Sequence, residues 1–198
     1  MAPPSTGIEI AAVLGTARPG NYTGKALDLV LDELNKQGAH ASLIDAGKIE
    51  LGLPEMGDMH PTVQHMKETV ERATGVILAT PEYHGSFSAA MKMIIENLGF
   101  PSVLGGKPVA LLGVAAGRIG AIKSLEQLRG VCSHVGAIVL PGPVSIAGVR
   151  GVFAEAGTCK DAQVEKQIRG LATAMLDYVR GSICPRFALE QMVRAESA

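Results

Sequence analysis

The 198-residue sequence is poor in cysteine, in net charge and in long apolar runs. Its three cysteines, Cys132, Cys159 and Cys184, form no CxxC or CxxH spacing, so we expect neither a disulfide framework nor a metal site. A net charge of −1 offers no basic field for nucleic acid and no acidic surface typical of small electron carriers. No run reaches 18 apolar residues, and the first residues show no basic segment followed by an apolar one, as a secretion signal would. We therefore expect a soluble, cytoplasmic protein with no membrane or nucleic-acid partner.

Aliphatic runs alternate with amphipathic segments along most of the chain. Short continuous runs indicate strands buried on both faces of a sheet, whereas apolar residues that recur every three or four positions indicate helices. The alternation predicts a doubly wound α/β fold, in which helices cover both faces of a five-stranded parallel sheet. The expected strands are 8–14, 41–44, 76–80, 109–114 and 137–140, and the expected helices are 23–38, 63–73, 87–98, 119–131 and 164–179.

The other segments are expected to be irregular. Residues 47–61 read as a surface loop, and residues 141–157 as a Gly-rich excursion. We expect one domain over residues 1–184, followed by a C-terminal tail over residues 185–198 whose structure the pattern does not predict. Alternation also leaves two strand orders open, the dinucleotide-binding order and the flavodoxin-like order 2-1-3-4-5.

The loop after the first strand, residues 15–23, lacks both GxGxxG and GxxxxGK[ST], so it carries neither a dinucleotide fingerprint nor an ATP loop. It is still suited to a phosphate. Thr16, Asn21 and Thr23 offer side-chain donors, Arg18 offers a cation, and a helix N-terminus follows. The alternatives are that Thr23 is only an N-cap and Arg18 a solvated charge, and this loop alone does not decide.

The turn after the third strand, residues 80–86, follows an apolar run and precedes a helical pattern. Tyr83 could stack on a flat heterocycle while backbone groups near Pro81, Glu82 and Gly85 approach its polar edge. Other interpretations stay open: a half-buried core aromatic for Tyr83, a surface or interface histidine for His84, and a helix-flanking charge rather than an acid or base for Glu82.

The loop after the fourth strand is Ala115-Ala-Gly-Arg-Ile-Gly120. Gly117 and Gly120 would let the backbone approach a ring closely, and Arg118 would hold an anion or pair with a carboxylate. Each signal is weak alone. The loops after strands one, three and four nevertheless meet at the carboxyl edge of such a sheet, where ligands of open α/β folds bind.

Together these loops resemble those of the NADPH-dependent FMN reductases, flavodoxin-like flavoenzymes that include quinone, azo-dye and chromate reductases. The resemblance covers residues 8–180. The first loop is similar to that family's phosphate loop, Gly-Ser-x-Arg with a further Ser and Asn. Residues 81–86 and 89–92 are similar to Pro-Glu-Tyr-Asn-Gly-Ser and its following Leu-Lys-Asn, with His84 in place of Asn. Residues 115–120 and 125–129 resemble the third flavin loop and the helix after it.

The resemblance implies the flavodoxin-like strand order, FMN as cofactor and NADPH or NADH as co-substrate. It further implies electron transfer to free flavin, a quinone or another small acceptor. We expect ping-pong kinetics and no catalytic side chain, because the flavin itself accepts the hydride. A homodimer or homotetramer through helices 87–98 and 119–135 is expected. The alternatives are a non-enzymatic electron-transfer or flavin-sensing module, and a phosphate-ligand domain without redox chemistry. The implied FMN-binding residues are Thr16, Arg18, Asn21, Tyr22, Thr23, Pro81, Glu82, Tyr83, His84, Gly85, Ala116, Gly117, Arg118 and Gly120.

Overall fold

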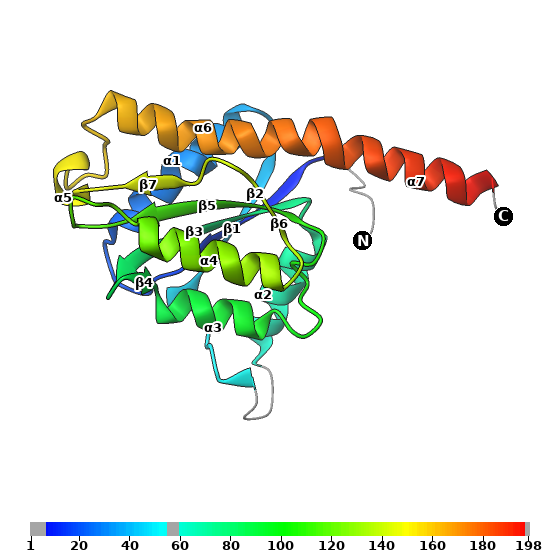
Figure 1. The fold of residues 1–198 in the computed structure, drawn as a ribbon, viewed down its shortest axis with the longest axis horizontal. Coiled ribbons are helices and arrows are strands. Elements are labelled where there is room, and N and C mark those ends of the chain that lie inside the picture. Colours follow the sequence, from blue (N-terminus) through cyan, green and yellow to red (C-terminus); the bar gives the residue numbers. More distant parts are fainter. Residues whose placement is uncertain (1–6, 55–59, 197–198) are drawn as a thin grey trace.

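A parallel sheet forms the centre of the protein in the computed structural model, which describes residues 7–54 and 60–196 (Figure 1). The strands are ordered β2-β1-β3-β5-β6, and the short β4 pairs only with β3. Once β4 is set aside, this is the flavodoxin-like order 2-1-3-4-5, so the predicted fold is confirmed. The strands are β1 (Glu9–Leu14), β2 (His40–Asp45), β3 (Gly75–Tyr83), β4 (Ser86–Phe87), β5 (Pro108–Val114), β6 (Ile138–Val139) and β7 (Val144–Ile146).

Helices cover both faces of the sheet. The helices α1 and α6 lie on one face, and α2, α3 and α4 lie on the other (Figure 1). None of the helices in the described ranges is long and apolar enough to cross a membrane. The helices are α1 (Tyr22–Lys36), α2 (Pro61–Arg72), α3 (Ala89–Asn97), α4 (Ile122–His134), α5 (Val149–Val152), α6 (Ala162–Tyr178) and α7 (Cys184–Glu196), with a 3₁₀ turn η1 (Ala46–Lys48) and a π-helical turn η3 (Val179–Ile183).

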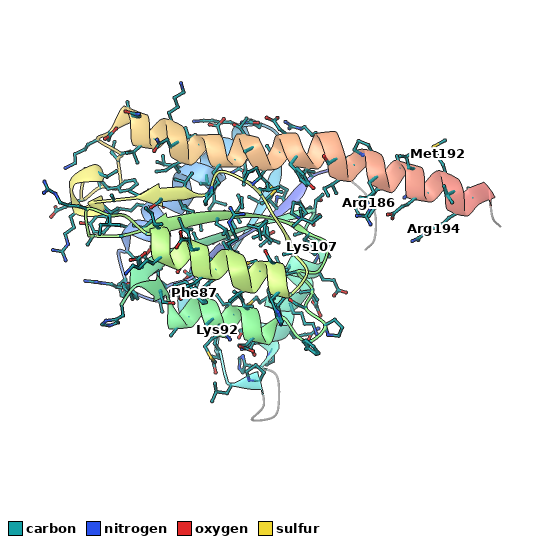
Figure 2. All side chains as sticks on the ribbon, viewed as in Figure 1. Phe87, Lys92, Lys107, Arg186, Met192 and Arg194 are labelled. Carbon is teal, nitrogen blue, oxygen red and sulfur yellow. The ribbon has the colours of Figure 1, made fainter. Side chains whose placement is uncertain are left out.

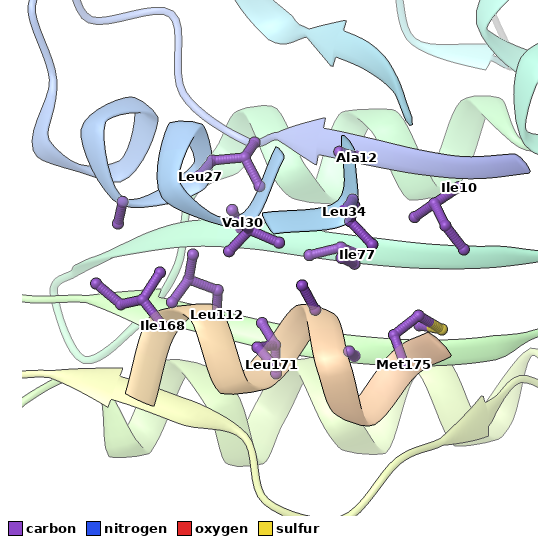
Figure 3. Close-up of a cluster of buried hydrophobic side chains, with 14 of the residues drawn as sticks. Ile10, Ala12, Leu27, Val30, Leu34, Ile77, Leu112, Ile168, Leu171 and Met175 are labelled. Atoms are coloured by element: carbon purple, nitrogen blue, oxygen red, sulfur yellow. The ribbon is translucent and has the colours of Figure 1, made fainter. Parts of the chain in front are cut away.

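The core consists of two apolar layers, one on each face of the sheet. Alternate residues of β1 supply the two layers: Ile10 and Ala12 face α1 and α6, whereas Ala11 and Val13 face α2 and α3. Figure 3 shows the first layer, where α1 and α6 meet over β3 and β5. Each fully buried large side chain contributes about 1.5–3 kcal/mol, so these layers fix the strand ends that carry the loops.

The last strand of the sheet is divided in two, where a single strand over residues 137–140 was expected. The strands β6 and β7 both pair with β5, and they are separated by Pro141-Gly142-Pro143. Proline has no N–H to donate to a ladder, which explains the interruption. Because β7 falls in the expected excursion 141–157, this segment returns to the carboxyl edge of the sheet.

Two helices begin later than the sequence pattern suggested. Phe87 belongs to β4 instead of a helix, and the Ser88 hydroxyl caps α3 by accepting from the Met91 N–H at 3.0 Å. The helix α4 begins at Ile122, so Ile119 lies outside it with 76% of its surface exposed.

The expected C-terminal tail is helical. The helix α6 continues through η3 into α7, which extends beyond the sheet and carries the labelled Arg186, Met192 and Arg194 (Figure 2). A domain boundary after residue 184 stays a prediction. The expected surface loop 47–61 includes η1, and its residues 55–59 lie outside the described ranges.

Candidate functional site

The loops after β1, β3 and β5 meet at the carboxyl edge of the sheet. The Gly15 N–H donates to the Ala79 carbonyl at 2.8 Å, and the Ser88 hydroxyl donates to the Gly15 carbonyl. These bonds join the first loop to β3 and α3. A cleft of 440 Å³ opens between the loops and is lined by Arg18, Pro19, Gly20, Asn21, Tyr22, Thr23, Lys25, Pro81, Glu82, Tyr83, Val114, Ala116, Val149 and Arg150.

Polar side chains of the first loop mainly hold the loop itself. The Asn21 amide oxygen accepts from the Gly24 N–H at 2.6 Å, and its NH₂ group donates to the Arg18 carbonyl at 2.7 Å. Asn21 is therefore the N-cap of α1, so the reading of Thr23 as N-cap is wrong. The Thr16 hydroxyl accepts from the Arg18 N–H at 3.3 Å.

The start of α1 keeps donors for a ligand. The N–H groups of Tyr22 and Thr23 have no partner within the helix, because they precede the first intrahelical bond. They lie in the lining of the cleft together with the exposed Arg18. A helix N-terminus with a nearby guanidinium favours an anion, and phosphate in particular.

The turn after β3 is a two-residue hairpin rather than a direct entry into a helix. His84 has φ +51° and Gly85 has φ +72°, and Tyr83 pairs with Ser86 across the turn. Two consecutive positive φ angles are typical of type I′ turns, which favour Asn followed by Gly. The backbone conformation alone therefore explains the Asn that the similar family motif has in place of His84. A histidine also tolerates the left-handed region.

The helix α4 holds this turn. The Gln127 amide donates to the Gly85 carbonyl at 2.9 Å and accepts from the Ser86 hydroxyl at 2.7 Å. The Glu82 carboxylate accepts from the Ser124 N–H at 3.1 Å. The N-cap residue of α4, Ala121, has no capping side chain, so Glu82 supplies the missing acceptor. This contact favours the helix-flanking interpretation of Glu82 over an acid or base.

The loop after β5 is bonded to the segment that follows β7. The Gly117 carbonyl accepts from the Gly148 N–H at 3.0 Å, and the Ala115 carbonyl accepts from the Val149 N–H at 3.1 Å. Gly120 has φ +80°, and a Cβ there would approach the Ser145 hydroxyl to 2.6 Å. Gly120 therefore serves packing as well as backbone conformation.

The structure divides the expected site residues into two groups. Arg18, Asn21, Tyr22, Thr23, Pro81, Glu82, Tyr83 and Ala116 line the cleft. The others lie in the same loops but outside that lining: Thr16, His84, Gly85, Gly117, Arg118 and Gly120.

Sequence reasoning missed part of the cleft wall. Pro19, Gly20, Lys25 and Val114 adjoin expected residues, so a wider window around each loop would have included them. Val149 and Arg150 follow β7, which the sequence pattern did not reveal. Three cations, Arg18, Lys25 and Arg150, face this cleft with a single carboxylate, Glu82.

The cleft suits FMN by the chemistry of its two ends. The first loop offers N–H donors and a cation for the phosphate, and the turn after β3 offers Tyr83, 42% exposed, together with backbone groups for a ring. In residues 7–54 and 60–196, no group of three or more His, Cys, Asp or Glu side chains is arranged to hold a metal ion.

This fold and cleft define a flavodoxin-like protein, and solved structures share the architecture. FerB, a flavoenzyme NAD(P)H:(acceptor) oxidoreductase from Paracoccus denitrificans, matches with a TM-score of 0.75 and 22% identity over 88% of this chain and 98% of that chain. A flavodoxin from the domain Archaea matches with a TM-score of 0.59 and 12% identity over 87% of this chain and 98% of its own. At these identities the likeness shows the fold alone.

The chain belongs to the NADPH-dependent FMN reductase family, whose profile matches residues 8–150. A 2-hydroxy-1,4-benzoquinone reductase from Burkholderia is 29% identical over 69% of this chain and 76% of its own. An NAD(P)H-dependent FMN reductase from Pseudomonas aeruginosa is 28% identical over 89% of this chain and 97% of its own. The resemblance is thus confirmed, and the family supports an enzyme with FMN and NAD(P)H over a non-enzymatic carrier.

Proposed function

We propose that the protein is an FMN-containing reductase that takes reducing equivalents from NADPH or NADH and passes them to free flavin, a quinone or another small acceptor. The observation that carries this proposal is the cleft itself, which joins an anion-binding helix start to a surface with an exposed aromatic ring. When bound there, FMN supplies the hydride and electron chemistry. The side chains bind and orient, and none acts as nucleophile or proton donor.

The first loop holds the FMN phosphate in this proposal. Arg18 and the N–H groups of Tyr22 and Thr23 contact it, because these residues line the cleft and the two N–H groups have no partner within the helix. Thr16 and Asn21 support the phosphate site indirectly, because their side chains form hydrogen bonds that fix the conformation of the loop.

The other two loops hold the ring. Backbone groups of residues 81–85 and 116–120 lie along its edge, with Tyr83 against its plane and His84 and Arg118 at its rim. His84 and Gly85 shape the pocket through the hairpin turn. The Glu82 carboxylate holds the turn against α4 by accepting from the Ser124 N–H. In this proposal the carboxylate takes no part in proton transfer.

A ring held against the loops leaves one face open. Reduced nicotinamide and acceptor then use this face in turn, which gives ping-pong kinetics with release of the oxidised nicotinamide first. Relatives are named as quinone reductases and NADPH azoreductase. A quinone or a similar flat acceptor fits the same exposed face here.

A homodimer or homotetramer in the cytoplasm completes the proposal. Exposed apolar side chains next to α3 and α4 support an interface through these two helices. They are Phe100, Ile119 and Ile122, with 97%, 76% and 47% of their surfaces exposed. A partner subunit seated there would cover part of an exposed flavin.

The testing experiment is anaerobic reduction of the FMN-loaded protein by NADPH, followed by a panel of quinones, azo dyes and free flavin. We expect bleaching of the flavin absorbance without any partner protein, and reoxidation by at least one small acceptor. Parallel double-reciprocal plots would support the ping-pong order. A protein that binds FMN but is not reduced by either nicotinamide would be an electron-transfer or sensing module instead.

A further inference from the structure

Arg150 is a cation in the cleft wall, and the binding roles proposed above for the three loops do not include it. Arg150 belongs to α5 and lines the same cleft as Arg18 of the first loop. Within the described ranges, no hydrogen bond or ion pair joins the Arg150 guanidinium to another residue. The guanidinium is therefore available to a ligand, and the only carboxylate of the lining, Glu82, bonds to α4.

The backbone around Arg150 is fixed to the loop after β5. The Gly148 N–H donates to the Gly117 carbonyl at 3.0 Å and the Val149 N–H to the Ala115 carbonyl at 3.1 Å. The Val149 side chain is buried, with 3% exposed. Figure 1 shows α5 and β4 at the same end of the sheet. Arg150 thus extends from a rigid point of the cleft wall.

The first turns of α1 hold the other side of this segment. The Lys25 ammonium donates to the carbonyls of Ala154 and Glu155, each at 3.0 Å. The Tyr22 and Phe153 rings pack with their centroids 6.4 Å apart. Residues 148–155 are therefore joined both to the loop after β5 and to the helix start that binds the phosphate.

We propose that Arg150 is a second cation for the FMN phosphate, with Lys25 as the residue that positions its segment. This proposal rests on the proposed function. A phosphate monoester carries a charge of roughly −1.5 to −2 at neutral pH, so two guanidinium groups and a helix N-terminus match it. Riboflavin lacks the phosphate, and the contribution of Arg150 therefore appears as selectivity for FMN over riboflavin.

The test uses flavin-free protein titrated with FMN and with riboflavin, followed by quenching of flavin fluorescence. Arg150→Gln should weaken FMN about 10-fold and leave riboflavin within about 2-fold, as for the loss of one charge-assisted contact. Lys25→Met should lower the FMN-to-riboflavin affinity ratio by a smaller factor, and Lys25→Arg should restore it. Lys160→Gln is the matched control, because Lys160 is an exposed cation beyond α5 that does not line the cleft, and its ratio should equal that of the wild type.

The outcomes separate this inference from the proposed function. If the wild type prefers FMN over riboflavin but Arg150→Gln keeps that preference, the role of Arg150 is wrong and the phosphate site stands. Equal losses for both flavins would assign Arg150 to the ring or to folding. A changed KM for NADPH but not for NADH, with FMN affinity unchanged, would place Arg150 on the co-substrate. A wild type without preference for FMN would overturn the phosphate site itself.

Discussion

The first loop and the turn after β3 border the same cleft, but different parts of the chain hold them. Within the first loop, Asn21 and Thr16 bond to groups two or three residues away. The turn after β3 instead depends on Gln127 and Ser124, which are about forty positions further along the chain. These side-chain bonds of the first loop therefore depend on residues of the loop itself, whereas the position of the turn after β3 also depends on residues of α4.

The largest effect is expected at Gly15, where the two regions meet. A Cβ at this position would approach the Met91 methyl group to 2.6 Å and the Ala79 carbonyl oxygen to 3.0 Å. Gly15→Ala should lower the free energy of unfolding by about 1–3 kcal/mol, because overpacking forces the neighbours to shift. Urea denaturation measures this loss. Gly52→Ala is the control, since nothing lies within 4 Å of its Cβ, and equal losses in both variants would contradict the close approach.

The next effect concerns the bond between the turn and α4. Glu82→Ala should cost about 0.5–2 kcal/mol, because the Ser124 N–H loses its acceptor and the helix start loses a negative charge. Glu82→Gln keeps an acceptor and should cost less. The rate of flavin reduction by NADPH should keep the same pH dependence in both variants. Loss of a titration in Glu82→Gln would show that this carboxyl takes part in proton transfer.

The helix α4, which holds the turn after β3, contains the buried Cys132, and this thiol makes the stability of the protein depend on alkaline pH. Burial raises the pKa of the Cys132 thiol from 9.0 to about 12. Below pH 9 the thiol is protonated in both states and its contribution to stability is complete. As the pH rises from 9 towards 12, the thiol of the unfolded chain loses its proton first. The free energy of unfolding therefore falls by about 1 kcal/mol between pH 9 and pH 10.

Urea denaturation of the wild type and of Cys132→Ala at pH 8 and pH 10 measures this dependence. The stability difference between the two proteins should shrink at pH 10, because only the wild type carries the thiol. A difference that stays constant would contradict the raised pKa. Thiol reagents should also leave Cys132 unmodified in the folded protein at pH 8.

The smallest effect is expected for a conservative change at the hairpin, His84→Asn. His84→Asn should change stability by no more than about 0.5 kcal/mol, in the stabilising direction, because Asn tolerates a positive φ well. His84→Val should lose about 1–2 kcal/mol, since a β-branched residue resists this conformation. Single-turnover reduction of His84→Asn by NADPH between pH 5.5 and 8.5 should remain within about tenfold of the wild type. A drop beyond roughly 10²-fold with loss of a titration near neutrality would make His84 an acid or base.

Much of the fold was accessible from the sequence because its signals are local. Runs such as 76–80 and 109–114 are continuous and aliphatic, and both became buried central strands. The divided strand was hidden, because the three-residue β7 lies among prolines and glycines that indicate a loop. The helix α7 was also missed, because Pro185 and the charged residues Arg186, Glu190 and Arg194 made the segment look like a polar tail, although Leu189, Met192 and Val193 recur at helical spacing.

The candidate site was accessible in part, for the same reason. Arg18 and Asn21 stand in one loop whose residue types indicate a phosphate. The partner of Glu82 could not be found from the sequence, because the Ser124 N–H is a backbone group without a side-chain signature. Arg150 was hidden as well, since its place in the cleft depends on the return of β7 to the sheet.

The most direct test of the phosphate site is calorimetric titration of flavin-free wild type and Arg18→Ala with FMN and with riboflavin. Arg18→Ala should lose roughly 10-fold or more in FMN affinity, because a charge-assisted contact contributes about 1.5–3 kcal/mol, while riboflavin affinity stays the same. Unchanged FMN affinity in Arg18→Ala would contradict the assignment of the first loop to the phosphate.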